Sequence, residues 1–167
     1  NDFFTGNYPT SFSRGELYNN DPVTRDARFC GTTASMCGIE KAGFCGDGEG
    51  MDQAIRLDEM LHAFMFIQSG IPVIYSGDEV GQVNDYTYKE DPEKREDSRY
   101  IHRGKFCWDL EEKIDEPGTV QDRLFHALRK LEVLRARDAV FDSRVPFYMA
   151  QTGDISVLCL VRRGEKE

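Results

Sequence analysis

The stretch that most constrains the fold runs from Gly70 to Gly81 and reads GIPVIYSGDEVG. Its first part is a short run that is apolar on both faces, which is typical of a buried parallel strand. Two acids, Asp78 and Glu79, follow the run. Acids placed where a parallel strand opens into a loop stand where α/β proteins keep their ligand sites, although such acids can also just accept hydrogen bonds from nearby backbone amides. We therefore predict a strand at residues 73–75 and a loop after it.

Helical patterns flank this stretch on both sides. From Met51 to Gln68, apolar side chains recur at three- and four-residue intervals, which predicts a helix with one apolar face. That face comprises Leu57, Met60, Leu61, Phe64 and Ile67. A second helix is predicted from Thr119, its N-cap, to about Arg137. Its predicted buried stripe comprises Val120, Leu124, Leu128, Leu131 and Leu134.

The first fifty residues show weaker patterns. Residues 1–30 are rich in aromatic, glycine and asparagine residues without periodicity, so we expect them to be irregular or short-helical. Thr32 or Thr33 can cap a short helix. Residues 43–50 are predicted to form a loop.

Two further segments follow the central stretch. Residues 84–116 are too long for a simple connector, and we expect their aromatic side chains to pack this charged loop into an ordered structure. Residues 147–150 and 155–161 are predicted as the two strands of a β-hairpin.

Charge narrows the choice of partners. The 167 residues carry a net charge of −9. Nucleic acids and anionic membranes bind basic faces, so we expect neither as a partner, whereas a neutral small molecule would be indifferent to the charge. No apolar run approaches the ~20 residues of a membrane span.

The sequence predicts neither a metal ion nor a cofactor. The five cysteines contain no Cys-x-x-Cys pair, and their odd number favours reduced thiols in a cytoplasmic protein. The intervals between Cys30, Cys37 and Cys45 match no common zinc spacing. The acids of residues 47–52 lack the register of an EF-hand. His62 is interpreted as a structural histidine with no carboxylate spaced to pair with it.

Three stretches carry a resemblance to a known family. They read FFTGNYPTSFSRG with DPVTRDARFCGTTASMCG after it, then GIPVIYSGDEVGQVND, then DSRYIHRG with Trp108 after it. In order and spacing they resemble the alpha-amylase family of glycoside hydrolases, and most closely its sucrose-acting branch, the amylosucrases and sucrose hydrolases. Three features depart from the family pattern: Tyr100 stands where Trp is common, Gly104 stands where many members have Pro, and residues 39–51 are unusually rich in glycine. These departures leave the exact substrate open.

The resemblance implies a fold. The chain is shorter than the roughly 250 residues of a complete TIM (β/α)8 barrel. We therefore expect an α/β C-terminal fragment of such a barrel that runs into the start of an antiparallel β domain. Residues 1–50 would be an insertion after the seventh strand, and residues 51–140 the last helix–strand–loop–helix unit. Residues 141–167 would begin the C-terminal β domain.

The resemblance also implies sugar-binding residues. Arg99 matches the family arginine that pairs with an acid at the floor of the glucosyl pocket, where a guanidinium can fork hydrogen bonds to a carboxylate or to sugar hydroxyls. Arg28 resembles the arginine near the fructosyl or acceptor site, and Asp85 and His102 are further candidates. No acid of the chain matches the catalytic carboxylates, which lie on earlier strands in this family. We therefore expect the fragment to be inactive by itself.

The leading functional hypothesis is the C-terminal part of an α-retaining glucosyl enzyme. Its substrate would be sucrose or a related small α-glucoside, used for hydrolysis or for glucosyl transfer. Other amylase-family enzymes, such as an α-glucosidase, a trehalose synthase or a sucrose phosphorylase, are alternatives. A non-catalytic carbohydrate-binding or interaction domain is an alternative of another class. The exposed edges of an unpaired strand would also favour self-association of the fragment.

Overall fold

The computed structural model describes residues 1–19, 21–24 and 28–164. Within these residues the chain forms five α-helices, four short 3₁₀ helices and two antiparallel sheets of two strands each. The fold is therefore mixed α and β. The elements are β1 (Glu16–Tyr18), β2 (Arg28–Cys30), α1 (Thr33–Cys37), α2 (Ile39–Cys45), α3 (Gly48–Ile67), η1 (Asp78–Val80), η2 (Thr87–Glu90), η3 (Ser98–His102), α4 (Trp108–Glu111), α5 (Val120–Arg137), η4 (Ala139–Phe141), β3 (Phe147–Ala150) and β4 (Cys159–Arg162).

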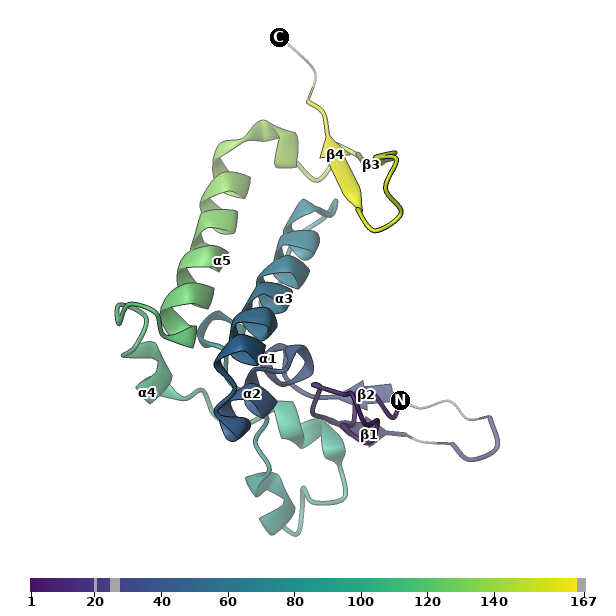
Figure 1. The fold of residues 1–167 in the computed structure, drawn as a ribbon, viewed down its shortest axis with the longest axis vertical. Coiled ribbons are helices and arrows are strands. Elements are labelled where there is room, and N and C mark those ends of the chain that lie inside the picture. The colour runs from purple at the N-terminus through teal and green to yellow at the C-terminus, as the bar shows by residue number, and fades with distance from the viewer. Residues whose placement is uncertain (20, 25–27, 165–167) are drawn as a thin grey trace.

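The long helices α3 and α5 lie side by side and form the body of the molecule, with α1 and α2 at the N-terminal end of α3 (Figure 1). The core between them consists of Ala34, Ile39, Ala54, Ile55 and Leu124. No helix in the described part of the chain is both long and apolar enough to cross a lipid bilayer.

Helix α3 begins earlier than predicted and buries a different face. The Asp47 carboxylate caps it by accepting from the Gly50 backbone N–H at 2.9 Å. The prediction of a loop at residues 43–50 is therefore wrong, because only Gly46 and Asp47 lie between α2 and α3. Met60 and Phe64, on the predicted apolar face, are 57% and 46% exposed. The α1, α2 and α5 contacts fall on another face, whose buried residues are Ala54, Ile55, Asp58, His62 and Phe66.

Helix α5 confirms its predicted limits. The Thr119 side chain accepts from the Asp122 N–H at 3.1 Å, and the helix ends at Arg137. Leu124 and Leu128 are buried as predicted. Leu134 is 51% exposed, because it lines an open surface groove instead of packing on α3.

The central stretch is not a paired strand. Residues 71–75 adopt no strand structure, and Ile71 and Val73 are 89% and 73% exposed. The prediction of a buried strand is therefore wrong for the described residues, since a strand needs a neighbour for its backbone hydrogen bonds and both sheets of the structure form elsewhere. Gly77, at φ +100°, then turns the chain into η1.

The first fifty residues contain a strand pair that their composition did not predict. β1 and β2 pair antiparallel, with Glu16 opposite Cys30 and Tyr18 opposite Arg28. Strands of three residues are too short to show periodicity, which is why the prediction of irregular structure failed here. Thr32 caps α1 as expected, by accepting from the Ser35 N–H. Residues 25–27, inside the DPVTRDARF stretch, lie outside the described residues.

The charged loop at residues 84–116 is ordered, as predicted. It folds into η2, η3 and α4, and it buries Tyr88 and Ile101 against Cys30 of β2. Trp108 does not pack the loop down as expected. It is 69% exposed and forms an edge contact with the Phe106 ring, at 4.8 Å between centroids.

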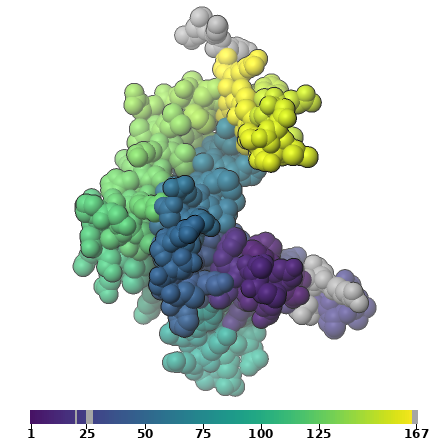
Figure 2. Space-filling view, viewed as in Figure 1, coloured from purple at the N-terminus to yellow at the C-terminus, as the bar shows by residue number. Residues whose placement is uncertain are grey.

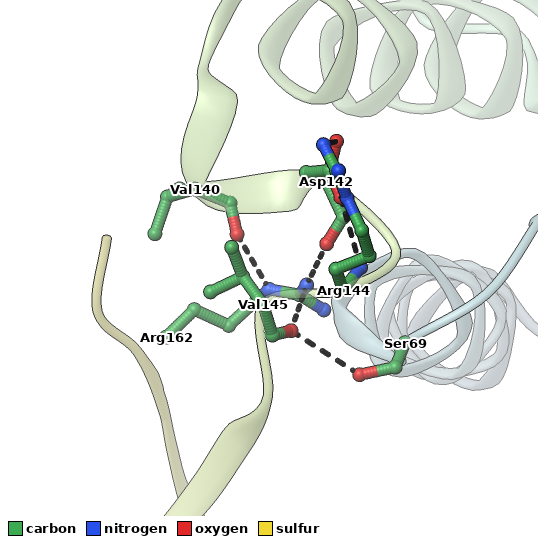
Figure 3. A network of polar contacts seen from close by, with 6 residues as sticks. All are labelled: Ser69, Val140, Asp142, Arg144, Val145 and Arg162. Atoms are coloured by element: carbon green, nitrogen blue, oxygen red, sulfur yellow. Dashed lines mark hydrogen bonds and ion pairs between the residues drawn. The ribbon is translucent and has the colours of Figure 1, made fainter. Parts of the chain in front are cut away.

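The C-terminal hairpin confirms its prediction, with a shorter second strand. β3 and β4 pair antiparallel, and Figure 2 shows the hairpin standing apart from the N-terminal region, with a notch between them. Arg162 of β4 anchors it to the body (Figure 3). Its guanidinium donates to the backbone carbonyls of Ile67, Val140, Asp142 and Val145.

Candidate functional site

The β1–β2 pair brings two side chains that are ten residues apart in the sequence, Tyr18 and Arg28, to one face. Tyr18 and Arg28 are directly opposite each other in the antiparallel register, and opposite residues project from the same face of a pair. The 3₁₀ helix η3 lies against this pair, where the Ser98 hydroxyl donates to the Leu17 carbonyl at 2.9 Å. Arg28 of β2 therefore stands on the Tyr18 face of this pair, and η3 is held beside the pair.

Arg99 of η3 completes this group. Its guanidinium carbon lies 4.6 Å from the centroid of the Tyr18 ring. Its Nε donates to Asp97 Oδ1 at 2.8 Å and its Nη2 to Asp97 Oδ2 at 2.6 Å. The Arg99 fork lowers the pKa of Asp97 to about 2. Because the two side chains are 41% and 25% exposed, this is a partly solvated ion pair rather than a buried one.

We call Arg28, Tyr18 and Arg99 the arginine–tyrosine cluster. Arg28 is exposed, and no hydrogen bond or ion pair of its side chain is formed with the described residues. One edge of the Arg99 guanidinium faces Asp97, so its other edge keeps N–H donors free for a ligand. Two planar guanidinium groups beside an aromatic ring can bind a small molecule that carries hydroxyl or carboxylate oxygens.

His102 lies next to the cluster but faces another aromatic ring. It follows Arg99 by three residues, and side chains at this spacing lie on one face of a 3₁₀ helix. Its ring meets the edge of the Tyr75 ring at 5.8 Å between centroids. Burial lowers the pKa of His102, and its Nδ1 is buried without a hydrogen-bond partner among the described residues. His102 therefore connects the site to the end of the 71–75 segment.

Asp85 closes a turn instead of joining the cluster. Its backbone N–H donates to the Ile101 carbonyl at 2.8 Å, which fixes it beside η3. Its Oδ1 accepts from the Thr87 N–H at 2.9 Å and from the Thr87 hydroxyl at 2.6 Å. A Cβ at Gly104 would lie 2.7 Å from Asp85 Oδ2, so a larger residue at position 104 would displace this carboxylate.

Sequence reasoning missed a buried charged group at the loop after residues 71–75. His62 Nδ1 lies 2.8 Å from Asp58 Oδ1, and His62 Nε2 lies 3.7 Å from Asp78 Oδ2. Burial opposes the charge on His62, but the nearby carboxylates of Asp58 and Asp78 outweigh burial and raise the pKa of His62 to about 10. The interpretation of His62 as unpaired is therefore wrong. The spacing of Asp58, four residues before His62, was the signal that could have revealed the pair.

The Asp58–His62–Asp78 group has a structural consequence. It ties η1, which carries Asp78, to the middle of α3. Glu79 supports the same turn, since its Oε2 accepts from the Gly77 N–H at 2.9 Å. Both acids of the central stretch therefore hold the loop, which is one of the two roles that the sequence allowed.

No group of three or more metal-ligating side chains in the described part of the chain could hold a metal ion. The chain matches no protein-family model. The arginine–tyrosine cluster is consequently the feature on which a function can be argued.

Proposed function

We propose that this chain is the C-terminal part of an α-retaining glucosyl enzyme of the alpha-amylase family, and that it acts on sucrose or a related small α-glucoside. The observation that carries the proposal is that Arg99 lies over the Tyr18 ring while Arg28 stands opposite Tyr18 in the β1–β2 register. These arginines come from two of the three stretches that resemble the family. The position of both arginines around Tyr18 comes from the strand register and the ring contact, and not from the sequence spacing on which the resemblance was based.

The layer beside the cluster agrees with a barrel origin. Residues 71–75 expose Ile71, Val73 and Tyr75, while α3 and α5 lie side by side. An apolar extended segment that ends in a glycine turn needs strands on its edges to satisfy its backbone. In the proposed enzyme these strands belong to the rest of the barrel.

The roles of the residues follow from their chemistry. Arg99, oriented by Asp97, presents its free N–H edge to the hydroxyls of the glucosyl unit, and Arg28 contacts the fructosyl or acceptor side. Tyr18 holds the Arg99 plane through its ring face. The two carboxyl groups that break and re-form the glycosidic bond, roughly 5 Å apart in a retaining enzyme, are assigned to sequence that precedes Asn1 in the intact enzyme.

Sucrose turnover by the intact enzyme tests these roles through Arg99→Lys. A lysine keeps the charge but cannot form hydrogen bonds to Asp97 and to a sugar at the same time, as the planar guanidinium can. We therefore expect kcat/KM to fall about tenfold or more, since one charge-assisted hydrogen bond contributes about 1.5–3 kcal/mol. Arg95→Lys is the matched control, because Arg95 lies in the same loop and its side chain forms an ion pair with the exposed Glu96. Near-full turnover by Arg99→Lys would refute the role of Arg99. Sucrose binding without any turnover by the intact protein would favour the non-catalytic binding domain.

A further inference from the structure

An open groove of about 700 Å³ follows the outer face of α5. Val133 and Leu134 give it an apolar floor and are 38% and 51% exposed. The basic side chains that line it are His126, Arg129, Lys130 and Arg137. Asp138 is the single acid among the lining residues. On a chain with a net charge of −9 this basic and apolar face is a local exception.

The charges of this groove are only partly used within the molecule. Arg129 pairs with Glu132 at 2.8 Å. Lys130 and Arg137 form no ion pair with any residue that the structure describes. Cations in the last turn of a helix are favoured by the helix dipole, which explains Arg137 but not the exposed Val133 and Leu134 beside it. The apolar floor instead indicates a surface that is covered by a partner.

The same chain carries a segment of matching chemistry. Residues 108–116 read WDLEEKIDE and contain five acids against one lysine. No side chain of these acids forms an ion pair within the described residues, and Trp108 at the start of the segment is 69% exposed. We call residues 108–116 the acidic segment.

The two surfaces cannot meet within one copy. α4, which begins the acidic segment, lies beside the N-terminal end of α5, whereas the groove runs from residue 126 to residue 139 toward the other end of that helix (Figure 1). If a second copy places its α5 antiparallel to the first, the acidic end of each helix comes beside the basic end of the other. The contact is then the same in both directions and closes as a dimer.

We propose that two copies of this protein associate through antiparallel α5 helices, with the acidic segment of each copy seated in the basic groove of the other. Trp108 covers Val133 and Leu134, and the acids face Lys130 and Arg137. Exposed ion pairs contribute only about 0.2–1 kcal/mol each and are screened by salt. The dimer is therefore reversible and weakens when the salt concentration rises.

Charge reversal on each surface tests this arrangement by sedimentation equilibrium. The double variant Lys130→Glu/Arg137→Glu gives the groove a net negative charge, like that of the acidic segment. The triple variant Glu111→Lys/Glu112→Lys/Glu116→Lys gives the segment a net positive charge, like that of the groove. Each variant is expected to raise the dimer dissociation constant about tenfold or more, which corresponds to about 1.4 kcal/mol. An equimolar mixture of the two variants is expected to restore the dimer, because each groove then meets a segment of opposite charge.

The mixture separates this proposal from other kinds of association and also shows that both variants are folded. The control variant Lys105→Glu/Arg163→Glu changes the net charge by the same amount as Lys130→Glu/Arg137→Glu, but at exposed positions outside the groove. It should leave the dimer intact. Trp108 is the single tryptophan, so its emission should shift to shorter wavelength as the dimer forms. A wild-type protein that stays monomeric at every concentration would overturn the proposal. So would a dimer that survives both reversals, or a mixture that stays monomeric.

Discussion

Removing the guanidinium of Arg162 should detach the C-terminal hairpin from the helical body. Arg162 donates from Nε to the Val140 carbonyl at 2.8 Å and from Nη2 to the Asp142 carbonyl at 2.7 Å, and Nη2 also reaches the Val145 carbonyl (Figure 3). Its Nη1 donates to the Ile67 carbonyl at 2.8 Å. These acceptors belong to the end of α3, to η4 and to the segment before β3, so one side chain joins three parts of the chain.

The size of the effect follows from these bonds. A net contribution of about 0.5–1.5 kcal/mol for each of four hydrogen bonds would give about 2–6 kcal/mol. The site is only partly buried, so water replaces some of the lost donors, and we expect Arg162→Ala to lower the free energy of unfolding by about 2–3 kcal/mol. Amide exchange should speed up first in β3 and β4, because the anchor lies at their base.

Urea unfolding of Arg162→Ala and of Arg163→Ala measures this effect. Arg163 is the next residue, carries the same charge and is exposed, so its replacement should change the free energy of unfolding by less than about 0.5 kcal/mol. Equal losses in the two variants would show that net charge matters rather than the carbonyl contacts. An unchanged stability of Arg162→Ala, with β3 and β4 still protected, would refute the anchoring role.

Three further predictions follow from the body of the protein. Gly81→Ala should lower the free energy of unfolding, measured in urea, by about 2–4 kcal/mol, because Gly81 has φ +62° and an added Cβ would lie 2.9 Å from Leu124 Cδ1. Gly153→Ala is its control and should lower the free energy of unfolding by only about 1 kcal/mol, because Gly153 has φ +79° but nothing lies within 4 Å of an added Cβ. The pKa of His62, raised from 6.5 to about 10, supplies stability that is complete below pH 6.5 and lost as the pH rises through 10. The stability difference between wild type and His62→Gln should therefore shrink by roughly 2–4 kcal/mol over that range, at about 1.4 kcal/mol per pKa unit, whereas the exposed His126→Gln should show no such change. Backbone amides of residues 73–75 should exchange rapidly in the monomer, and strong protection there would contradict the unpaired state of this segment.

Local patterns predicted those elements whose signals lie within a few residues. The Thr119 cap and the spacing of the leucines predicted the limits of α5. Two apolar runs on either side of a turn predicted the hairpin. The order of the 84–116 loop followed from its aromatic content. In each case residues that are close in the sequence determine the structure, so the sequence is sufficient to predict the element.

Features that depend on distant contacts could not be predicted in this way. The buried face of α3 is selected by α1, α2 and α5, and not by its own strongest apolar stripe, so Phe64 is exposed and His62 is buried. Residues 71–75 have the composition of a buried strand, but a strand exists only beside another strand. The position of Arg28 opposite Tyr18, the residue that also contacts Arg99, depends on the β1–β2 register, and three-residue strands carry no readable periodicity.

Sucrose turnover by the full-length protein that contains this chain, measured beside residues 1–167 on their own, tests the central claim most directly. We predict that the full-length protein releases or transfers glucose from sucrose and that the 167 residues alone do neither, because the catalytic carboxylates are assigned to sequence before Asn1. Turnover by the 167 residues, with contaminating enzyme excluded, would contradict that assignment. A full-length protein that acts on no α-glucoside would contradict the proposed function itself.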